Sequence, residues 1–111
     1  MLNIAITAGG TSEPIDGVRR LTNVSTGLLG WYCLEAILDY FCARKRSDFR
    51  ITYILTDTAF RKVLSEKQRS FVDFIPVSDA ESVYHAVDAL TKRVPVDFFI
   101  HSMAISDFTL A

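Results

Sequence analysis

A stretch rich in glycine and hydroxyl side chains, Ala8–Gly30, follows the apolar run Leu2–Thr7. Within it, the pair Gly9–Gly10 would let the backbone approach a ligand without an intervening Cβ. Ser25 and Thr26 could cap a helix or donate hydroxyl hydrogen bonds to phosphate oxygens. In an open parallel sheet such loops lead into helix N-termini, whose unpaired N–H groups bind anions. We therefore expect this stretch to cradle the phosphates of a nucleotide.

The glycines of this stretch also have a purely structural interpretation. Gly27 and Gly30 fall in the first turn of an expected helix, where each glycine costs about 1 kcal/mol relative to alanine. Either a phosphate needs the space, or the glycines permit tight turns and close packing of the helix on a sheet. The spacing differs from the GxGxxG fingerprint of dinucleotide-binding proteins, and only Asp57 stands near the end of the second expected strand. An NAD(P)-dependent oxidoreductase is therefore the weaker enzymatic alternative.

A second candidate segment, Ser102–Asp107, follows the last expected strand. Asp107 could accept hydrogen bonds from ribose hydroxyls or a base, or it could cap a helix. Asn23 could stabilise a developing oxyanion near a helix N-terminus, or it could serve as a turn residue. The residue types alone leave these alternatives open. His101 fits a satisfied strand end and His85 a solvent-facing helix position, and the sequence contains no nucleophile triad and no zinc motif.

Hydrophobic periodicity predicts alternating strands and helices that would position these segments. The expected elements are strands at Leu2–Thr7, Arg50–Thr56, Phe71–Val77 and Val96–His101, helices at about Thr26–Ala43 and from a capping box at Ser78–Glu81 to about Arg93, and a short helix or irregular loop at Thr58–Gln68. Pro76 is typical of an outer strand. The continuous apolar run Val96–His101 is typical of a strand covered by helices on both faces. This order predicts one α/β domain over residues 1–111, a Rossmann-like three-layer fold with a mostly parallel sheet.

Composition restricts the possible partners. The 111 residues carry 12 Lys and Arg against 13 Asp and Glu, a formal net charge of −1, so no global field attracts nucleic acid or an anionic membrane. The N-terminus lacks a basic region, and its apolar run is too short for a signal peptide. The apolar segment Leu28–Cys42 contains Glu35 and Asp39 and is too short to span a bilayer. We expect a cytoplasmic protein in which Cys33 and Cys42 are reduced core residues.

Several motifs resemble the phosphopantothenate–cysteine ligase family, above all its stand-alone bacterial form. They are IAITAGGTSEPID at Ile4–Asp16, the pair Val18–Arg19, TN followed by STG and a further glycine within Thr22–Gly30, and HSMAISDF at His101–Phe108. The match is collinear along the whole chain. The resemblance implies that CTP activates the carboxylate of 4′-phosphopantothenate, giving an acyl-cytidylate and pyrophosphate. The amine of cysteine would then displace CMP, a step of coenzyme A biosynthesis.

The resemblance also assigns roles to residues. Those implied in phosphate or nucleotide binding are Gly10, Ser25, Thr26, Gly27, Gly30, Ser102, Met103 and Asp107. Ser102 and Met103 would act partly through backbone atoms, and Asn23 would stabilise the acyl-cytidylate and its attack by cysteine. Mg²⁺ would accompany CTP, and no side chain is assigned to it as a ligand. The choice of CTP over ATP follows only from the likeness to bacterial members.

Members of this family are longer than this chain, and their second half supplies the rest of the nucleotide pocket and a flap that bridges subunits. The resemblance therefore implies a truncated fold that binds nucleotide weakly and does not turn over until the second half is supplied. The helix at Thr26–Ala43 is apolar nearly all round, so a face that does not cover the sheet needs a partner. That partner would be a second subunit of a homodimer or the missing C-terminal half. A non-catalytic nucleotide-binding or subunit-interaction module is the alternative from another functional class.

Overall fold

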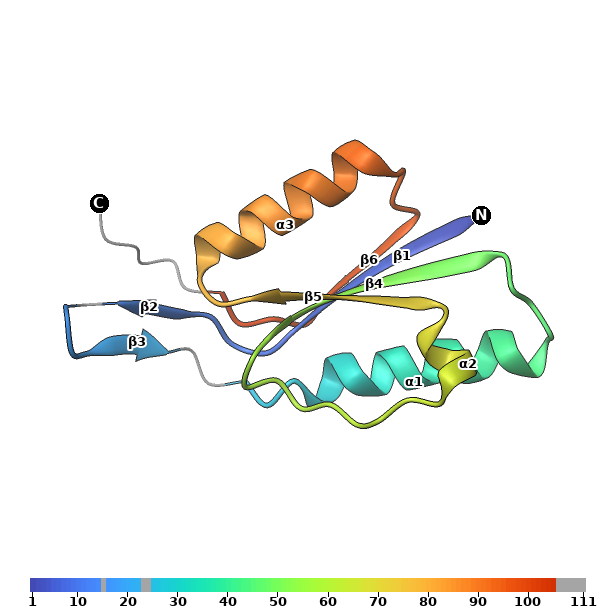
Figure 1. The fold of residues 1–111 in the computed structure, drawn as a ribbon, viewed down its shortest axis with the longest axis horizontal. Helices are drawn as coiled ribbons and strands as arrows, with labels where there is room; N and C mark the ends of the chain where they lie inside the picture. The colour runs from blue at the N-terminus through green and yellow to red at the C-terminus, as the bar shows by residue number, and fades with distance from the viewer. Residues whose placement is uncertain (15, 23–24, 106–111) are drawn as a thin grey trace.

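The computed structural model of the protein describes residues 1–14, 16–22 and 25–105. Two of the expected site residues, Asn23 and Asp107, therefore lie outside the described residues. The elements follow in the order β1 (Leu2–Ala8), β2 (Ser12–Pro14), β3 (Arg20–Thr22), α1 (Leu28–Ala43), β4 (Phe49–Thr56), α2 (Glu66–Arg69), β5 (Val72–Val77), α3 (Ala80–Arg93) and β6 (Phe98–His101). Figure 1 shows α1 and α3 on opposite sides of the sheet, and the β2–β3 hairpin projecting beyond the body of the fold.

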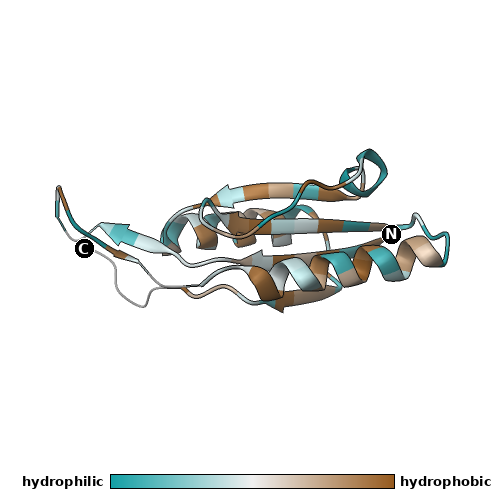
Figure 2. Ribbon diagram, turned by 90° about the horizontal axis from the view of Figure 1, so that it is seen from below, coloured by the Kyte–Doolittle hydropathy of each residue, from teal (hydrophilic) through white to brown (hydrophobic). Residues whose placement is uncertain are grey.

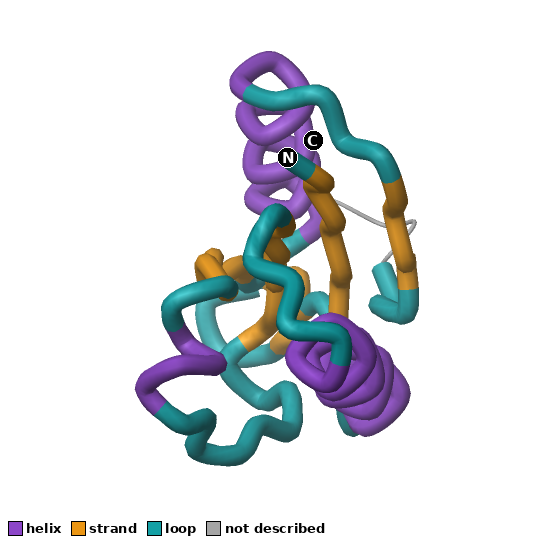
Figure 3. Tube along the Cα trace, turned by 90° about the vertical axis from the view of Figure 1, so that its right-hand side faces the viewer, coloured by secondary structure: helices purple, strands orange, loops and turns teal. Residues whose placement is uncertain are grey.

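Within the described residues the central sheet has four strands in the order β5-β4-β1-β6, and each of these strand pairs is parallel. Ile4 of β1 lies opposite Ile51 of β4 on one side and Phe98 of β6 on the other. Helices α3 and α1 lie above and below this sheet (Figure 3). The expected three-layer α/β fold with a mostly parallel sheet is thus confirmed.

Alternate side chains of β4 face the two helices, as the two-residue period of a strand requires. Ile51, Tyr53 and Leu55 belong to the buried cluster on the α1 side, whereas Ile54 packs with Val83 of α3. Apolar segments are visible along the strands as well as on the helices (Figure 2). Burying a side chain of this size contributes about 1.5–3 kcal/mol to the free energy of folding. The alternation therefore stabilises the packing of one helix on each face of the sheet.

Helix α1 buries only one of its faces. Trp31 is fully buried, lies edge-on to the ring of Tyr53 with 5.8 Å between centroids, and donates from its indole N–H to Glu35. On the opposite face Leu29 is 67% exposed and Tyr32 is 55% exposed. The expectation that part of this apolar helix stays uncovered is confirmed. None of the helices in the described ranges is long and apolar enough to cross a membrane.

The structure differs from the sequence prediction between β1 and α1. Only a turn-rich segment is predicted there, but β2 and β3 form an antiparallel hairpin in which Ser12 is paired with Thr22. The hydroxyls of these two residues lie 2.9 Å apart. Each strand has only three residues and little apolar character, so no alternation marks it in the sequence.

The predicted capping box at Ser78–Glu81 is wrong by one position. Asp79 is the N-cap of α3, and its carboxylate accepts a hydrogen bond from the Ser82 N–H at 2.8 Å, while the Ser82 hydroxyl accepts one from the Asp79 N–H at 3.0 Å. Serine and aspartate are equally good N-caps, so the sequence does not choose between them. The ambiguous segment at Thr58–Gln68 is an irregular loop followed by the one-turn helix α2.

The last strand is shorter and more exposed than the sequence predicts. It begins at Phe98 rather than Val96, and it lies at the edge of the sheet beside β1. Phe98 is 59% exposed and Phe99 is 44% exposed. The prediction of helices over both faces of this strand is therefore wrong for the described part of the chain. The other edge strand is β5, as Pro76 predicts.

Candidate functional site at the switch point of the sheet

The loops after β1 and β6 meet where the strand order reverses. From β1 the chain proceeds to β4 and β5 on one side and returns to β6 on the other, and such switch points bind ligands in open α/β sheets. The Thr11 N–H donates to the Ala104 carbonyl, and the Ala104 N–H donates to the Gly9 carbonyl, both at 2.9 Å. The Ser102 hydroxyl donates to the Thr7 carbonyl at 2.5 Å. The two segments predicted to hold the ligand are thus joined along one edge.

Gly9 and Gly27 adopt backbone conformations that favour glycine. Their φ angles are 99° and 77°, in the left-handed region. A Cβ on Gly9 would lie only 2.1 Å from Oγ1 of Thr56, and one on Gly27 would lie 3.0 Å from both Ala59 Cβ and the Phe60 nitrogen. Both glycines therefore let the loop after β4 pack directly against the loop after β1 and the start of α1.

Gly30 is required by close packing of α1 on β1. It is buried, and a Cβ there would lie 2.6 Å from Cβ of Ala8 and 2.8 Å from Oγ of Ser102. The structural interpretation of the glycines thus accounts for Gly30 as well as for the two glycines with positive φ. Its consequence is functional, because the missing Cβ brings the first turn of α1 down onto the joined edge of β1 and β6.

The N-terminus of α1 presents backbone donors at this edge. The Leu28 N–H donates to the Thr26 hydroxyl at 3.3 Å, and the Trp31 N–H donates to the Gly27 carbonyl at 3.1 Å. Among the described residues, none accepts a hydrogen bond from the N–H of Leu29 or Gly30. The first turn contains no acidic side chain, so the partial positive charge of the helix end is not neutralised there. This arrangement suits a phosphate or carboxylate.

A polar cavity of about 280 Å³ adjoins Gly10. Its lining comes from the loop after β1, the hairpin, the loop after β4 and the end of β5, and consists of Gly10, Ser12, Arg20, Thr22, Asp57, Thr58 and Ser78. The Arg20 guanidinium is held in place, because Nε donates to the Ser12 hydroxyl and Nη2 to the Ser12 carbonyl, both at 2.8 Å. The cavity therefore combines one fixed cation, Arg20, and one carboxylate, Asp57, with several hydroxyls, and it suits a polar ligand that places an anionic group near Arg20.

No sequence pattern marks Arg20 or Thr58 as lining residues of this cavity. Both depend on elements without a periodic signal, since Arg20 lies on the short strand β3 and Thr58 on the loop after β4. The one available signal was the position of Arg20 directly after the motif pair Val18–Arg19.

The tip of the hairpin is stabilised by an exposed ion pair. The N–H groups of Val18 and Arg19 each donate to Oδ1 of Asp16 at 2.8 Å, and the Arg19 guanidinium contacts Oδ2 at 2.7 Å. These hydrogen bonds hold the pKa of Asp16 below its usual value, with the backbone donors of Val18 and Arg19 as the main cause. The pair orders the turn that carries Arg20 toward the cavity.

The remaining predicted residues occupy different environments. Ser25 is half-buried and Thr26 is exposed. Met103 is 6% exposed and packs with Ile54 and Val83 on the α3 side, so its side chain is committed to the core and its backbone is the part left to contact a ligand. Ser102 is half-buried beneath the first turn of α1. Their roles in binding stay predictions.

The histidines and cysteines take structural positions. Nδ1 of His101 lies 2.7 Å from the Thr7 hydroxyl, whereas His85 is exposed, 3.4 Å from a carboxylate oxygen of Glu81. Cys33 and Cys42 are unpaired and half-buried. Within the described ranges, no three His, Cys, Asp or Glu side chains are grouped closely enough to hold a metal ion.

The chain is similar in sequence and in fold to proteins of coenzyme A and pantothenate metabolism. The Coenzyme A biosynthesis bifunctional protein CoaBC of Bacillus subtilis is 32% identical over 107 residues, which cover 96% of this chain and 23% of that protein. The solved structure of the DNA/pantothenate metabolism flavoprotein from Streptococcus pneumoniae has a TM-score of 0.75 and 28% identity, covering 98% of this chain and 42% of that one. The chain therefore spans less than half the length of these relatives.

Two further solved structures share the fold. The C-terminal domain of CoaBC has a TM-score of 0.73 and 28% identity, over 97% of this chain and 47% of that one. A Cab2 mutant in complex with phosphopantothenate-cysteine has a TM-score of 0.74 at 16% identity, over 98% of this chain and 47% of that one, a likeness of fold alone. The sequence matches one family profile over residues 1–111, and the chain belongs to the family of the DNA/pantothenate metabolism flavoprotein C-terminal domain.

Proposed function

We propose that this chain forms the phosphate-binding part of a phosphopantothenate–cysteine ligase, which joins 4′-phosphopantothenate to cysteine in coenzyme A biosynthesis with CTP as co-substrate. The family match over the whole chain carries the proposal. It is supported by the name of the Bacillus subtilis relative, a coenzyme A biosynthesis protein. The meeting of Gly10, the loop after β6 and the α1 N-terminus at the switch point supports the phosphate-binding role.

In the proposed reaction a carboxylate oxygen of 4′-phosphopantothenate attacks the α-phosphorus of CTP, and pyrophosphate leaves with the electrons of the broken P–O bond. The cysteine amine then attacks the acyl carbon, loses a proton, and CMP departs. Neither step needs a covalent protein nucleophile, because positioning and charge stabilisation suffice for nucleotidyl transfer. We assign Asn23 to stabilisation of the acyl-cytidylate and of its attack by cysteine.

The chain's own groups would bind and orient the triphosphate. The N–H groups of Leu29 and Gly30 and the partial charge of the α1 N-terminus would hold phosphate oxygens. The guanidinium of Arg20, fixed on Ser12, would neutralise further charge from across the cavity. Ser25 and Thr26 would add hydroxyl contacts to phosphate oxygens, whereas Asp107 would accept hydrogen bonds from the ribose hydroxyls or the base. Together these groups suit several phosphates in a row better than a single anion.

Mg²⁺ fits this site only when it is bound together with the nucleotide. It would then neutralise part of the charge of the phosphates. Of the carboxylates in the described residues, Asp57 is the one that lines the polar cavity, and no group of three potential ligands surrounds it there. Magnesium readily keeps waters and takes one carboxylate together with substrate phosphates, so Asp57 is the residue that we assign to it.

We further propose that ligation needs either a complementary polypeptide segment or a second copy of this chain in a homodimer. We place the reaction in the cytoplasm. The chain spans less than half of its relatives, which is consistent with an incomplete active site. The test is a ligation assay on this chain co-expressed with the unmatched part of the Streptococcus pneumoniae protein. Product formation that requires both parts and CTP supports the proposal. Nucleotide binding without product in any combination supports a non-catalytic binding module instead, and preferential binding of NADH supports the oxidoreductase alternative.

A further inference from the structure

A hollow of about 280 Å³, which we name the basic pocket, is formed by the loop after β4, the short helix α2 and the edge strand β5. Three of the described residues that line it are cations and none is acidic. The lining consists of Arg61, Lys62, Val63, Leu64, Arg69 and Phe74. Because the chain as a whole carries a net charge of −1, this excess of positive charge is local.

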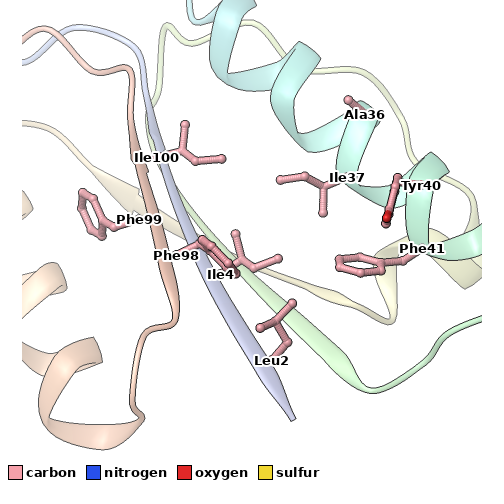
Figure 4. A pocket seen from close by; sticks show the side chains of 9 residues that line it. All are labelled: Leu2, Ile4, Ala36, Ile37, Tyr40, Phe41, Phe98, Phe99 and Ile100. Atoms are coloured by element: carbon pink, nitrogen blue, oxygen red, sulfur yellow. The ribbon is translucent and has the colours of Figure 1, made fainter.

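Other hollows of the described fold have different linings. The groove between α1 and β6 is apolar, and the Tyr40 hydroxyl is the one polar side-chain group among its lining residues (Figure 4). The polar cavity beside Gly10 combines Arg20 with the carboxylate of Asp57. In the basic pocket all the charged side chains have the same sign, and such a concave lining attracts a small anion.

The two arginines of the basic pocket lack the acceptors that most arginines of this chain have. Five guanidinium groups donate to oxygen atoms of described residues, those of Arg19, Arg20, Arg44, Arg46 and Arg50. Within the described ranges, the guanidinium groups of Arg61 and Arg69 donate to none, and Arg61 lies over the Phe74 ring at 4.4 Å from its centroid. Water satisfies a single exposed guanidinium, but here two of them converge on one hollow. Each presents a planar fork of N–H donors that matches an oxyanion.

Backbone hydrogen bonds fix the positions of both arginines. Arg61 directly follows Phe60, whose N–H donates to the Thr26 carbonyl at 2.7 Å, so the loop after β4 is bound to the start of α1. Arg69 ends α2, and its N–H donates to the carbonyl of the N-cap residue Ser65 at 2.9 Å. Groups that are already positioned lose less conformational entropy when a ligand binds. The pocket is therefore largely formed before it is occupied.

The charges of the basic pocket match a dianion. Nζ of Lys62 lies 3.7 Å from a carboxylate oxygen of Glu35, so the charge of Lys62 is partly neutralised. The charges of Arg61 and Arg69 have no such partner among the described residues, and the carboxylate of Asp57 lines an adjoining hollow rather than this one. A phosphate monoester carries a charge of about −1.5 to −2 at neutral pH, whereas a carboxylate carries a single charge. Phosphate is therefore the better match.

We propose that the basic pocket binds the phosphate group of a small phosphorylated metabolite, as a second anion site separate from the switch point. Its volume lies just below the range of about 300–1,000 Å³ of ligand pockets, so it suits one phosphate-bearing group better than a nucleoside triphosphate. Phe74 and Leu64 provide an apolar wall for the organic part of the ligand. Nucleic acid would need cations spread along an extended surface, which a small hollow does not provide. The proposal is independent of the proposed ligase chemistry.

The test is an NMR titration of the ¹⁵N-labelled chain with inorganic phosphate and with phenyl phosphate, at constant ionic strength so that screening does not change. We expect saturable shifts of the Arg61, Lys62 and Arg69 amides with both phosphates, and no saturable shift with acetate. Phenyl phosphate should bind more tightly than inorganic phosphate, because the apolar wall of the pocket can contact its ring.

Variants identify the groups that hold the phosphate. Arg61→Gln and Arg69→Gln should each weaken phosphate binding, as reported by these amides, at least about tenfold, because each removes charge-assisted hydrogen bonds. Arg93→Gln is the matched control, since it makes the same change of charge at a residue that lines neither the basic pocket nor the polar cavity. Arg69→Gln leaves the contact of Arg61 with Phe74 in place, and circular dichroism of each variant establishes that loss of binding is not loss of folding.

Three results would each overturn the proposal. The first is a linear, non-saturating response, which marks non-specific ion association. The second is a loss of affinity in Arg93→Gln equal to that in the two pocket variants, which indicates a general effect of net charge. The third is a shift of the pocket amides by an oligonucleotide but not by phenyl phosphate. Binding at the switch point is measured separately, from the Leu29 and Gly30 amides, so failure of the proposed nucleotide site would leave the results for the basic pocket unchanged.

Discussion

The carboxylate of Glu13 accepts a hydrogen bond from the backbone N–H of Ala80 at 2.6 Å, although 67 residues separate them in the sequence. Glu13 is 3% exposed. It lies on β2, and Ala80 is the first residue of α3, so this contact ties the hairpin that carries Arg20 to a helix N-terminus. A carboxylate also interacts favourably with the dipole at that end. The position of the polar cavity therefore depends on Glu13.

Replacing Glu13 should lower stability in a graded way. Glu13→Ala leaves the Ala80 N–H without its acceptor and should reduce the free energy of unfolding by about 1–3 kcal/mol. Glu13→Gln retains an acceptor oxygen and should cost less. Urea denaturation followed by circular dichroism measures both values. Equal destabilisation by the two variants would show that the hydrogen bond is not what matters.

Gly30 and Gly17 provide a matched pair for the packing of α1. Gly30→Ala introduces a Cβ at 2.6 Å from Ala8 Cβ and should destabilise the fold by about 1–3 kcal/mol through overpacking. Gly17→Ala meets nothing within 4 Å and should be nearly neutral. The comparison uses thermal unfolding of both variants. An unchanged midpoint for Gly30→Ala would contradict the close approach of helix and strand.

Asp79 makes stability depend on pH at the acid end. Hydrogen bonding from the Ser82 backbone N–H lowers the pKa of Asp79. A lowered pKa means that its contribution is fully present above the usual value of about 4 and is lost as pH falls through the lowered value. Asp79→Ala should remove about 1 kcal/mol at neutral pH. Asp79→Asn keeps a capping oxygen that does not titrate, so the free energy of unfolding of this variant, measured by urea denaturation, should fall less steeply than that of the wild type as pH falls below about 4.

Arg20 should distinguish triphosphate from monophosphate binding. Arg20→Gln removes the fixed cation of the cavity and should weaken CTP binding roughly tenfold or more, with a smaller effect on CMP. Arg20→Lys should recover part of the loss. Arg44→Gln, the same charge change at the far end of α1, is the control, because Arg44 stacks over Tyr40 at 3.6 Å, away from the cavity. Calorimetric titration gives the affinities, and equal losses for Arg20→Gln and Arg44→Gln would exclude Arg20 from the site.

Asn23 should act after activation. The variant is made in this chain co-expressed with the unmatched part of the Streptococcus pneumoniae protein. Asn23→Asp should still release pyrophosphate from CTP but should transfer the acyl group to cysteine slowly, because the introduced carboxylate repels developing negative charge. Pyrophosphate release and ligated product are measured in the same reaction. Unaffected product formation would remove Asn23 from this role.

Periodicity predicts most of the fold because burial imposes it. The run of β-branched and aromatic residues in β4 and the apolar stripe of α3 appear directly in the sequence, and the structure confirms both elements. The β2–β3 hairpin escapes prediction because contacts such as Ser12 with Thr22 and Glu13 with Ala80 fix it, and none of these leaves a periodic pattern. The exposure of Phe98 also escapes, because an apolar run indicates burial without saying what covers it.

The location of the candidate site is predictable from the sequence, but the reason for its glycines is not. The topology rule for parallel sheets brings the loops after β1 and β6 together, and the Gly10–Ala104 bridge confirms that juxtaposition. The reason for the glycines was not decidable from the sequence. Gly27 and Gly30 are explained by neighbours such as Ala59 and Ala8, whose proximity depends on the tertiary packing of α1.

The most direct test of the account is an NMR titration of the ¹⁵N-labelled chain with CTP. Binding at the switch point predicts saturable shifts of the Gly10, Leu29 and Gly30 amides, with smaller or no shifts in the distant Val63 and Arg44 amides. NADH at the same concentrations should leave the first group unmoved. Shifts absent from Gly10, Leu29 and Gly30 at saturating CTP, or produced equally by NADH, would contradict the central claim that this edge holds the phosphates of the nucleotide.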